Sequence, residues 1–139
     1  KEKLLLKRNH RLTNIRKNYL NQTISEIVNR KPRFICIEDL NVSGMMKNRH
    51  LSKAVQQQGF YEFRRQMEYK SKWNNIQVII ADQFFPSSKL CSCCGKIKKD
   101  LKLSERIYKC ECGNVIDRDL QAALNLKKYG EDVLKRSVA

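Results

Sequence analysis

Residues 90–120 read LCSCCGKIKKDLKLSERIYKCECGNVIDRDL. Two cysteine pairs, each followed by a glycine, run almost directly into two closely spaced aspartates. Zinc in a closed structural site takes four thiolates in a tetrahedral arrangement at about 2.3 Å. We therefore predict a structural Zn²⁺ site of the zinc-ribbon type. Its expected ligands are Cys91, Cys94, Cys110 and Cys112.

The choice of these four sulfurs follows from the glycines. Gly95 and Gly113 each follow the second cysteine of a pair, where the backbone must turn tightly around a metal. The second pair is shortened to CxC, and Cys93 is an extra sulfur that leaves a second register open for the first pair. A disulfide or free-thiol cluster and an iron–sulfur cluster are the alternatives to zinc. Because residues 86–116 contain almost no apolar core, we expect chelation to unfold this module.

Composition favours a polyanionic partner. The 139 residues include 29 Lys and Arg against 14 Asp and Glu, a formal net charge of +15. A globular domain this basic most often binds nucleic acid, although composition alone also allows an anionic membrane surface. No apolar run approaches the roughly 20 residues of a membrane-spanning helix.

Cysteine placement bears on the compartment. Clustered pairs in a lysine-rich chain without a signal-peptide pattern favour a reducing, prokaryotic-type cytoplasm and a bound metal over a secreted disulfide scaffold. The chain begins at Lys1 rather than Met, which favours a fragment or a processed product.

The pattern of apolar residues predicts alternating helices and strands. Residues 1–33 have apolar side chains at roughly helical spacing, which predicts one or two amphipathic helices ended by Pro32. Residues 34–40, FICIEDL, predict a strand buried on both faces that ends at Glu38 and Asp39. The further expectations are a loop at 41–54, a helix at 55–73 with an apolar face directed to the core, a strand at 76–81, a turn at 86–88, a short helix after Asp119 and a frayed tail after Gly130.

This order of elements predicts an α/β fold interrupted by a small insertion. We expect an α/β portion at 1–85, the zinc ribbon at 86–116, and a C-terminal motif with its helix at 117–139.

Two separated carboxylates suggest a second metal. Glu38 lies where a strand emerges, a common place for chemistry in open α/β sheets, and Asp119 lies at the start of a predicted helix. Carboxylate oxygens suit Mg²⁺, and two-metal nucleases need such acids from distant parts of the chain to converge. Sequence spacing alone does not show that convergence, and the acids at 38 and 39 are also explained by the start of a solvent loop.

Four stretches, in order, resemble the C-terminal part of insertion-sequence TnpB proteins and of the related compact type V CRISPR effectors. They are ICIEDLNVSGM, PSSKLCSCCG, YKCECG and IDRDLQAALNL, and the resemblance spans about residues 10 to 128. It implies a partial RNase H-like (RuvC) fold with an inserted zinc ribbon. It also implies an RNA-guided DNA endonuclease associated with transposition and DNA recombination, historically labelled a transposase, whose partners are a guide RNA and a target DNA.

The resemblance implies roles for individual residues. Glu38 of EDL and Asp119, the second aspartate of DRD, match catalytic Mg²⁺ ligands. Asp117 is expected to support them or to cap the helix, and Arg118 to face phosphate or pair with the acids. Gln121 stands where the family commonly has Asn.

One departure concerns the first catalytic aspartate. The family has it in a Gly-Ile-Asp-Leu-Gly-like motif that this chain lacks. We expect an upstream part of the same protein or a partner chain to supply it, and these 139 residues alone to be inactive. The alternative is a non-catalytic zinc-ribbon module or remnant that binds nucleic acid by charge. A zinc ribbon that serves only protein interaction leaves the EDL and DRD motifs unexplained.

Overall fold

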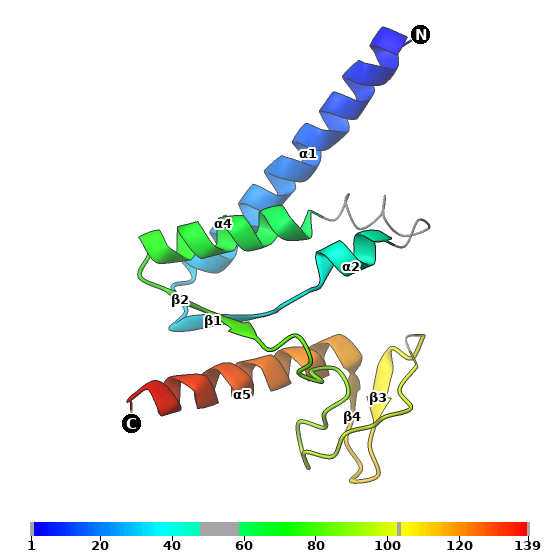
Figure 1. Ribbon diagram of the computed structural model, residues 1–139, viewed down its shortest axis with the longest axis vertical. Coiled ribbons are helices and arrows are strands. Elements are labelled where there is room, and N and C mark those ends of the chain that lie inside the picture. Colours follow the sequence, from blue (N-terminus) through cyan, green and yellow to red (C-terminus); the bar gives the residue numbers. More distant parts are fainter. Residues whose placement is uncertain (1, 48–58, 103, 139) are drawn as a thin grey trace. The chain divides into compact units, whose positions relative to one another are not determined.

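The computed structural model describes residues 2–47, 59–102 and 104–138. These residues form a mixed α/β protein, as expected, and divide into two compact units. The first unit comprises Lys1–Arg33 and Asn41–Val78, and the second comprises Phe34–Leu40 and Ile79–Ala139. Figure 1 follows the elements along the chain.

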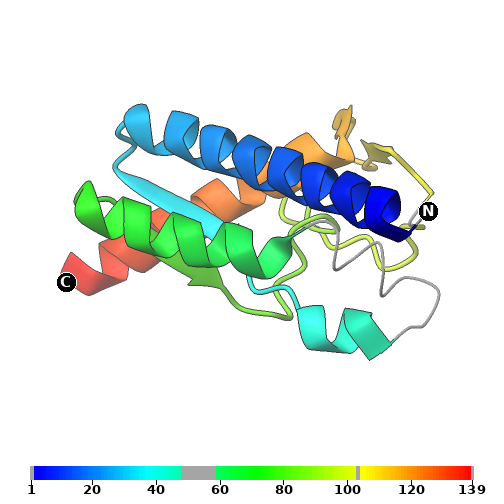
Figure 2. The ribbon, with the colours of Figure 1, turned by 90° about the horizontal axis from the view of Figure 1, so that it is seen from above.

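Two packed helices form most of the first unit. Helix α1 (Glu2–Asn29) is one continuous helix where one or two were predicted before Pro32, and α4 (Phe60–Trp73) packs beside it (Figure 2). Ile24 and Val28 of α1 and Met67 of α4 are buried. The predicted core face of the second helix is therefore confirmed at Met67.

The predicted apolar face of the first helix is wrong over most of its length. Leu5, Leu12, Ile15 and Tyr19 are all exposed, the last by 70%. The reason is geometric: at 1.5 Å per residue, the 28 residues of α1 extend about 42 Å and the 14 residues of α4 only about 21 Å. Within the first unit, α4 therefore covers only part of α1.

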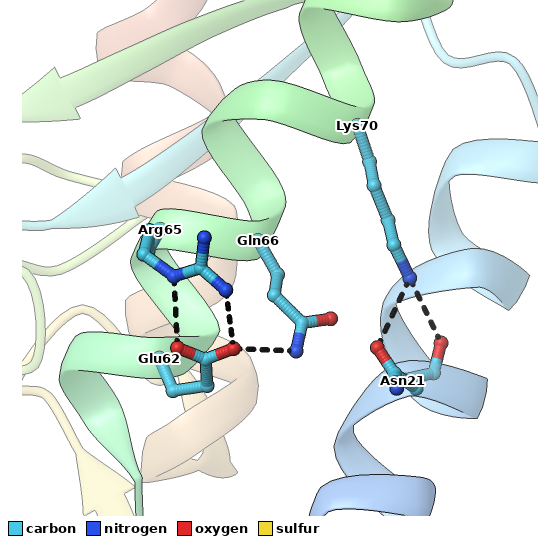
Figure 3. Close-up of polar contacts among 5 residues, drawn as sticks. All are labelled: Asn21, Glu62, Arg65, Gln66 and Lys70. Atoms are coloured by element: carbon cyan, nitrogen blue, oxygen red, sulfur yellow. Dashed lines mark hydrogen bonds and ion pairs between the residues drawn. The ribbon is translucent and has the colours of Figure 1, made fainter.

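Polar side chains add to the contact between these helices (Figure 3). Lys70 Nζ donates to Ser25 Oγ at 3.1 Å and to Asn21 Oδ1 at 3.4 Å. Along α4, hydrogen bonds from Arg65, the largest cause, and from Gln66 lower the pKa of the Glu62 carboxyl to about 2. The Lys70 contacts reinforce the part of α1 that the apolar core also covers, whereas those of Glu62 lie within α4.

Strands and a long helix form the second unit. Strand β1 (Phe34–Glu38) pairs with β2 (Gln77–Ala81) in a two-stranded sheet, so both predicted strands are confirmed. The prediction that β1 is buried on both faces is wrong, since its first four residues are only half-buried. In the described part of the chain the sheet has two strands, and each keeps one unpaired edge.

Helix α5 (Arg118–Val138) packs on β1. The expectation of a short helix followed by a frayed tail after Gly130 is wrong. The helix continues through Gly130, which is buried against the strand. A Cβ at this position would lie 3.0 Å from Phe34 Cδ2 and 3.2 Å from Cys36 Cβ. Glycine is thus required here for close approach, and tertiary packing overrides its low helix propensity.

The predicted loop at 41–54 is also corrected in part. Residues Val42–Lys47 form a short helix, α2, and Asn41 caps it by accepting a hydrogen bond at Oδ1 from the Gly44 N–H at 2.8 Å. Asparagine is among the residues preferred at this capping position. Residues 48–54, and 55–58 of the predicted second helix, lie outside the described residues. Among the helices that the structure describes, none has the length and apolar character needed to cross a membrane.

Candidate functional site

Two short hairpin-like elements frame the cysteines. Strands β3 (Ile107–Lys109) and β4 (Val115–Asp117) pair antiparallel with Tyr108 opposite Ile116, and the second cysteine pair lies in the turn between them. An antiparallel bridge joins Leu90 to Ile97 around the first pair. Tyr108 is fully buried and donates from its hydroxyl to the Lys89 carbonyl at 3.2 Å, which ties the two elements together.

The two glycines turn the backbone around the sulfurs as predicted. Gly95 and Gly113 have φ values of 74° and 89°, a region that L side chains rarely occupy. Their N–H groups donate to the carbonyls of Cys91 and Cys110 at 2.9 and 3.0 Å. The pairs therefore form matching knuckles even though the second is only CxC.

The four predicted ligands come together. The sulfurs of Cys91, Cys94, Cys110 and Cys112 all lie within 4.8 Å of one another. Cys91 Sγ is 3.7 Å from Cys112 Sγ, and Cys94 Sγ is 3.6 Å from Cys110 Sγ. A tetrahedron of sulfurs at about 2.3 Å from zinc has edges of about 3.8 Å. Cys93 is exposed and outside the cluster, and no cysteine is in a disulfide. The donor set therefore fits a structural zinc.

Thiol ionisation in this cluster also favours a cation. Burial opposes ionisation of Cys91, but hydrogen bonds from the backbone of Cys94 and from the Asn114 amide outweigh it and lower the pKa of Cys91 to about 6. The neighbouring sulfurs outweigh the Asn114 backbone N–H at Cys112 and raise the pKa of that thiol to about 12. Four thiolates are thus unfavourable together without a positive ion.

Buried amides join the ribbon to α5. Gln121 is fully buried; its Oε1 accepts from Ser92 Oγ at 2.9 Å and from Asn114 Nδ2 at 3.3 Å, and its Nε2 donates to the Leu90 carbonyl at 2.5 Å. Asn114 Nδ2 also lies 3.5 Å from Cys91 Sγ. The cysteine cluster is therefore attached to the helix by side-chain hydrogen bonds.

A second buried amide extends this attachment. Asn125 is 2% exposed and donates from Nδ2 to the carbonyls of Ser87 and Leu90, both at 2.7 Å. Sequence reasoning missed Asn125 and treated Gln121 only as a departure from the family pattern. Their spacing of four residues, which places two amides on one helix face, is the signal that was available.

The two predicted acids lie in the same compact unit. Glu38 ends β1 and is exposed, and its Oε1 accepts a hydrogen bond from Ser87 Oγ. Figures 1 and 2 both show β1 running opposite to α5, so that the Glu38 end of the strand is directed toward the N-terminal part of the helix. Asp119 is the second residue of that helix.

Asp119 lies on the same face of α5 as Gly130, which packs against β1. Asp119 precedes Gly130 by eleven residues, or about three turns, so the two lie on one face of α5. Gly130 lies against Phe34 and Cys36 of β1. The Asp119 carboxylate is exposed and takes no hydrogen bond from the residues that the structure describes.

The neighbours of Asp119 have other contacts. Asp117 Oδ1 accepts from the N–H groups of Asp119 and Leu120 at 2.9 and 3.1 Å, which is the helix-capping arrangement. Arg118 donates from Nη1 to the Lys102 carbonyl at 3.4 Å. Among the described residues, the cysteine cluster is the one group of three or more side chains arranged to hold a metal.

Comparisons with known proteins identify a matching family model and similar sequences. The family model described as Cas12f1-like, TNB domain, matches residues 60–126. A relative from Streptomyces pristinaespiralis, provisionally named an RNA-guided DNA endonuclease, is 38% identical over 86% of this chain and 30% of its own length. The TnpB-like protein L79 of Acanthamoeba polyphaga mimivirus is 36% identical over 91% of this chain and 25% of its own length.

A solved structure resembles the fold. The Cas12f1 chain in a Cas12f1–sgRNA–target DNA complex superposes with a TM-score of 0.63 at 20% identity, over 88% of this chain and 35% of that chain. This chain thus spans about a third or less of the proteins that it matches. Over that part, the chain is similar to TnpB/Cas12f-like proteins, and its residues 60–126 match their TNB domain.

Proposed function

We propose that this chain is the C-terminal RuvC and zinc-ribbon part of a TnpB-like RNA-guided DNA endonuclease that cleaves DNA with Mg²⁺. The observation that supports this most directly is the arrangement of the second unit. There β1, which ends at Glu38, runs toward the N-terminal part of α5, whose second residue is Asp119, and the cysteine cluster is attached to the same helix.

The residues fit the chemistry of the proposed ion. Glu38 and Asp119 offer exposed carboxylate oxygens, the ligands that Mg²⁺ prefers. A pair of such ions stabilises the attacking and leaving oxygens of a phosphodiester. The chain's own part is to hold the two carboxylates: Ser87 binds Glu38, and the Asp117 cap fixes the first turn that bears Asp119. The third acid, the aspartate of the family's first motif, comes in this proposal from an upstream part of the protein or from a partner chain.

Charge supports the proposed nucleic-acid partners. The formal charge of +15 is suited to a polyanion, and the zinc ribbon shares in it because residues 86–116 hold seven Lys and Arg against three Asp and Glu. The Cas12f1 relative was solved with its sgRNA and target DNA. We extend this to a guide RNA and a target DNA for the protein to which this chain belongs.

Charge-neutral variants of the two acids test the assignment. In the intact parent protein, Glu38→Gln and Asp119→Asn should each reduce Mg²⁺-dependent DNA cleavage by about 100-fold or more, because losing a metal ligand costs several kcal/mol of transition-state stabilisation. Asp132→Asn is the matched control: it removes a carboxylate from the same helix that pairs with Lys135 instead. Zinc content should be equal in all four proteins. Cleavage at the parental rate by both acid variants would show that the assignment is wrong.

A second candidate is a non-catalytic zinc module that binds nucleic acid by charge. The observation that favours it is that the described residues gather no group of three acids. Under this reading the parent protein binds nucleic acid with normal zinc content, and Mg²⁺ produces no cleavage in any variant.

A further inference from the structure

A continuous set of hydrogen bonds connects Glu38 to the zinc cluster. Glu38 Oε1 accepts from the Ser87 hydroxyl, and the Ser87 carbonyl accepts from Asn125 Nδ2. The Leu90 carbonyl accepts from both Asn125 Nδ2 and Gln121 Nε2. Asn114 Nδ2 donates to Gln121 Oε1 and also to Cys91 Sγ of the cluster. All these residues belong to the second unit. Two features that looked independent in the sequence are therefore physically joined.

Ser87 is the only member of this set that touches the candidate catalytic acid. Ser87 is 6% exposed, whereas Glu38 is exposed. Holding an exposed glutamate in one rotamer costs conformational entropy, and the hydrogen bond from a buried serine offsets that cost. Its backbone is held on both sides: the Ser87 N–H donates to the Phe85 carbonyl at 2.8 Å, and its carbonyl takes the Asn125 amide at 2.7 Å. These two hydrogen bonds fix the position of the backbone that bears the Ser87 hydroxyl.

Helix α5 holds the backbone that leads from Ser87 into the ribbon. Leu90 directly precedes Cys91, and its carbonyl receives both Gln121 Nε2 and Asn125 Nδ2. Tyr129 of α5 adds a ring contact with Phe85, at 4.8 Å between centroids, and its hydroxyl accepts from the Asp82 N–H at 3.3 Å. The segment leading into the first knuckle is therefore bound to α5 at several points.

We propose that Ser87 is a positioning residue that holds the Glu38 carboxylate for metal binding, and that the zinc ribbon and α5 fix Ser87 through Asn125 and Gln121. This rests on the proposed function, in which Glu38 is a Mg²⁺ ligand. Groups that hydrogen-bond to a metal's ligands fix the orientation of those ligands, and their loss typically weakens metal affinity 10–100-fold. In this proposal the ribbon orders a ligand of the second metal site as well as binding zinc.

Mn²⁺ binding to the intact parent protein tests the proposal without relying on cleavage. The paramagnetic resonance signal of free Mn²⁺ reports its affinity, and Mn²⁺ accepts the same oxygen ligands as Mg²⁺. Ser87→Ala should weaken Mn²⁺ binding about tenfold or more, and Ser87→Thr, which keeps the hydroxyl, should restore most of it. Ser88→Ala is the matched control, since it removes a hydroxyl one residue away and should leave the affinity unchanged.

A double substitution tests the route through α5. Asn125→Ala should weaken Mn²⁺ binding in the parent but add little in a Ser87→Ala background, because the two residues act on Glu38 in series. Zinc content should remain at the parental value in Ser87→Ala.

The outcomes separate this inference from the function on which it rests. If Glu38→Gln abolishes Mn²⁺ binding while Ser87→Ala binds it like the parent, the positioning role is wrong and the metal assignment stands. Loss of zinc or of folded structure in Ser87→Ala also overturns the inference, since Ser87 would then be a general structural residue. If Glu38→Gln binds Mn²⁺ like the parent, the proposed metal site itself fails.

Discussion

At the scale of single residues, one glycine decides how closely the long helix approaches the strand with the candidate acid. Gly130 lies in the middle of α5, where an alanine would ordinarily improve helix stability by about 1 kcal/mol. Here a Cβ would meet the ring of Phe34 and the Cβ of Cys36. The site therefore reverses the usual preference, because crowding of a packed contact outweighs backbone propensity.

Gly130→Ala should lower the free energy of unfolding by about 1–2 kcal/mol, the cost typical of adding a methyl group to a packed contact. Urea unfolding in zinc-replete buffer measures it. The control is the same substitution in a Phe34→Ala background, where the ring is gone and the cost should be smaller. An equal or larger cost in that background would contradict the assignment of the crowding to Phe34.

At the scale of elements, we expect the fold of the zinc ribbon to depend on a metal. In its described part, Cys91 and Tyr108 are buried, and much of the remainder is exposed. Little apolar surface is buried in such a segment, so we expect the four thiolates to supply the missing free energy through zinc. We likewise expect the ribbon's attachment to α5 to weaken when the metal is removed.

Neighbouring cysteines provide a matched pair of variants for the ribbon. Cys94→Ser should abolish stoichiometric zinc binding and collapse the amide dispersion of residues 90–117, because Cys94 Sγ belongs to the cluster. Cys93→Ser should keep both, since Cys93 is exposed and outside the cluster. Zinc analysis and amide NMR spectra check both variants. Zinc loss in Cys93→Ser with retention in Cys94→Ser would establish the other register.

At the scale of the whole molecule, the excess of basic residues governs association with polyanions. The charge of +15 is spread over much of the chain, and several ribbon residues that pair with acids, such as Lys96 with Glu111, are exposed. Pairs of this kind contribute little to stability and exchange readily for other partners. The surface is therefore suited to phosphate contacts.

Binding of the protein to duplex DNA should weaken steeply with salt. Each phosphate that a Lys or Arg neutralises should contribute about −0.9 to the slope of log K against log salt concentration, because condensed counterions are released. Titration at several salt concentrations measures the slope, and excess zinc should leave it unchanged. A flat response would remove the polyanion inference.

The prediction from sequence succeeded best where contacts are local. The cysteine ligands and their glycines were identified because the spacing within each pair fixes the knuckle. The strands were located because short β-branched runs are distinctive. The end of α5 and the exposed face of α1 were predicted wrongly, because Gly130 and the apolar residues of α1 take their environment from partners far away in sequence.

The sequence by itself indicated the two cysteine pairs with their glycines, the family resemblance and the places of Glu38 and Asp119 on a strand end and a helix start. These follow from residue type and short-range spacing. Only the tertiary structure decided that Cys93 lies outside the cluster, that Ser87 contacts Glu38 and that Asn125 holds the Ser87 carbonyl. The physical reason is that hydrogen bonds between groups 38 and 49 residues apart depend on how the chain packs, which periodicity along the sequence does not encode.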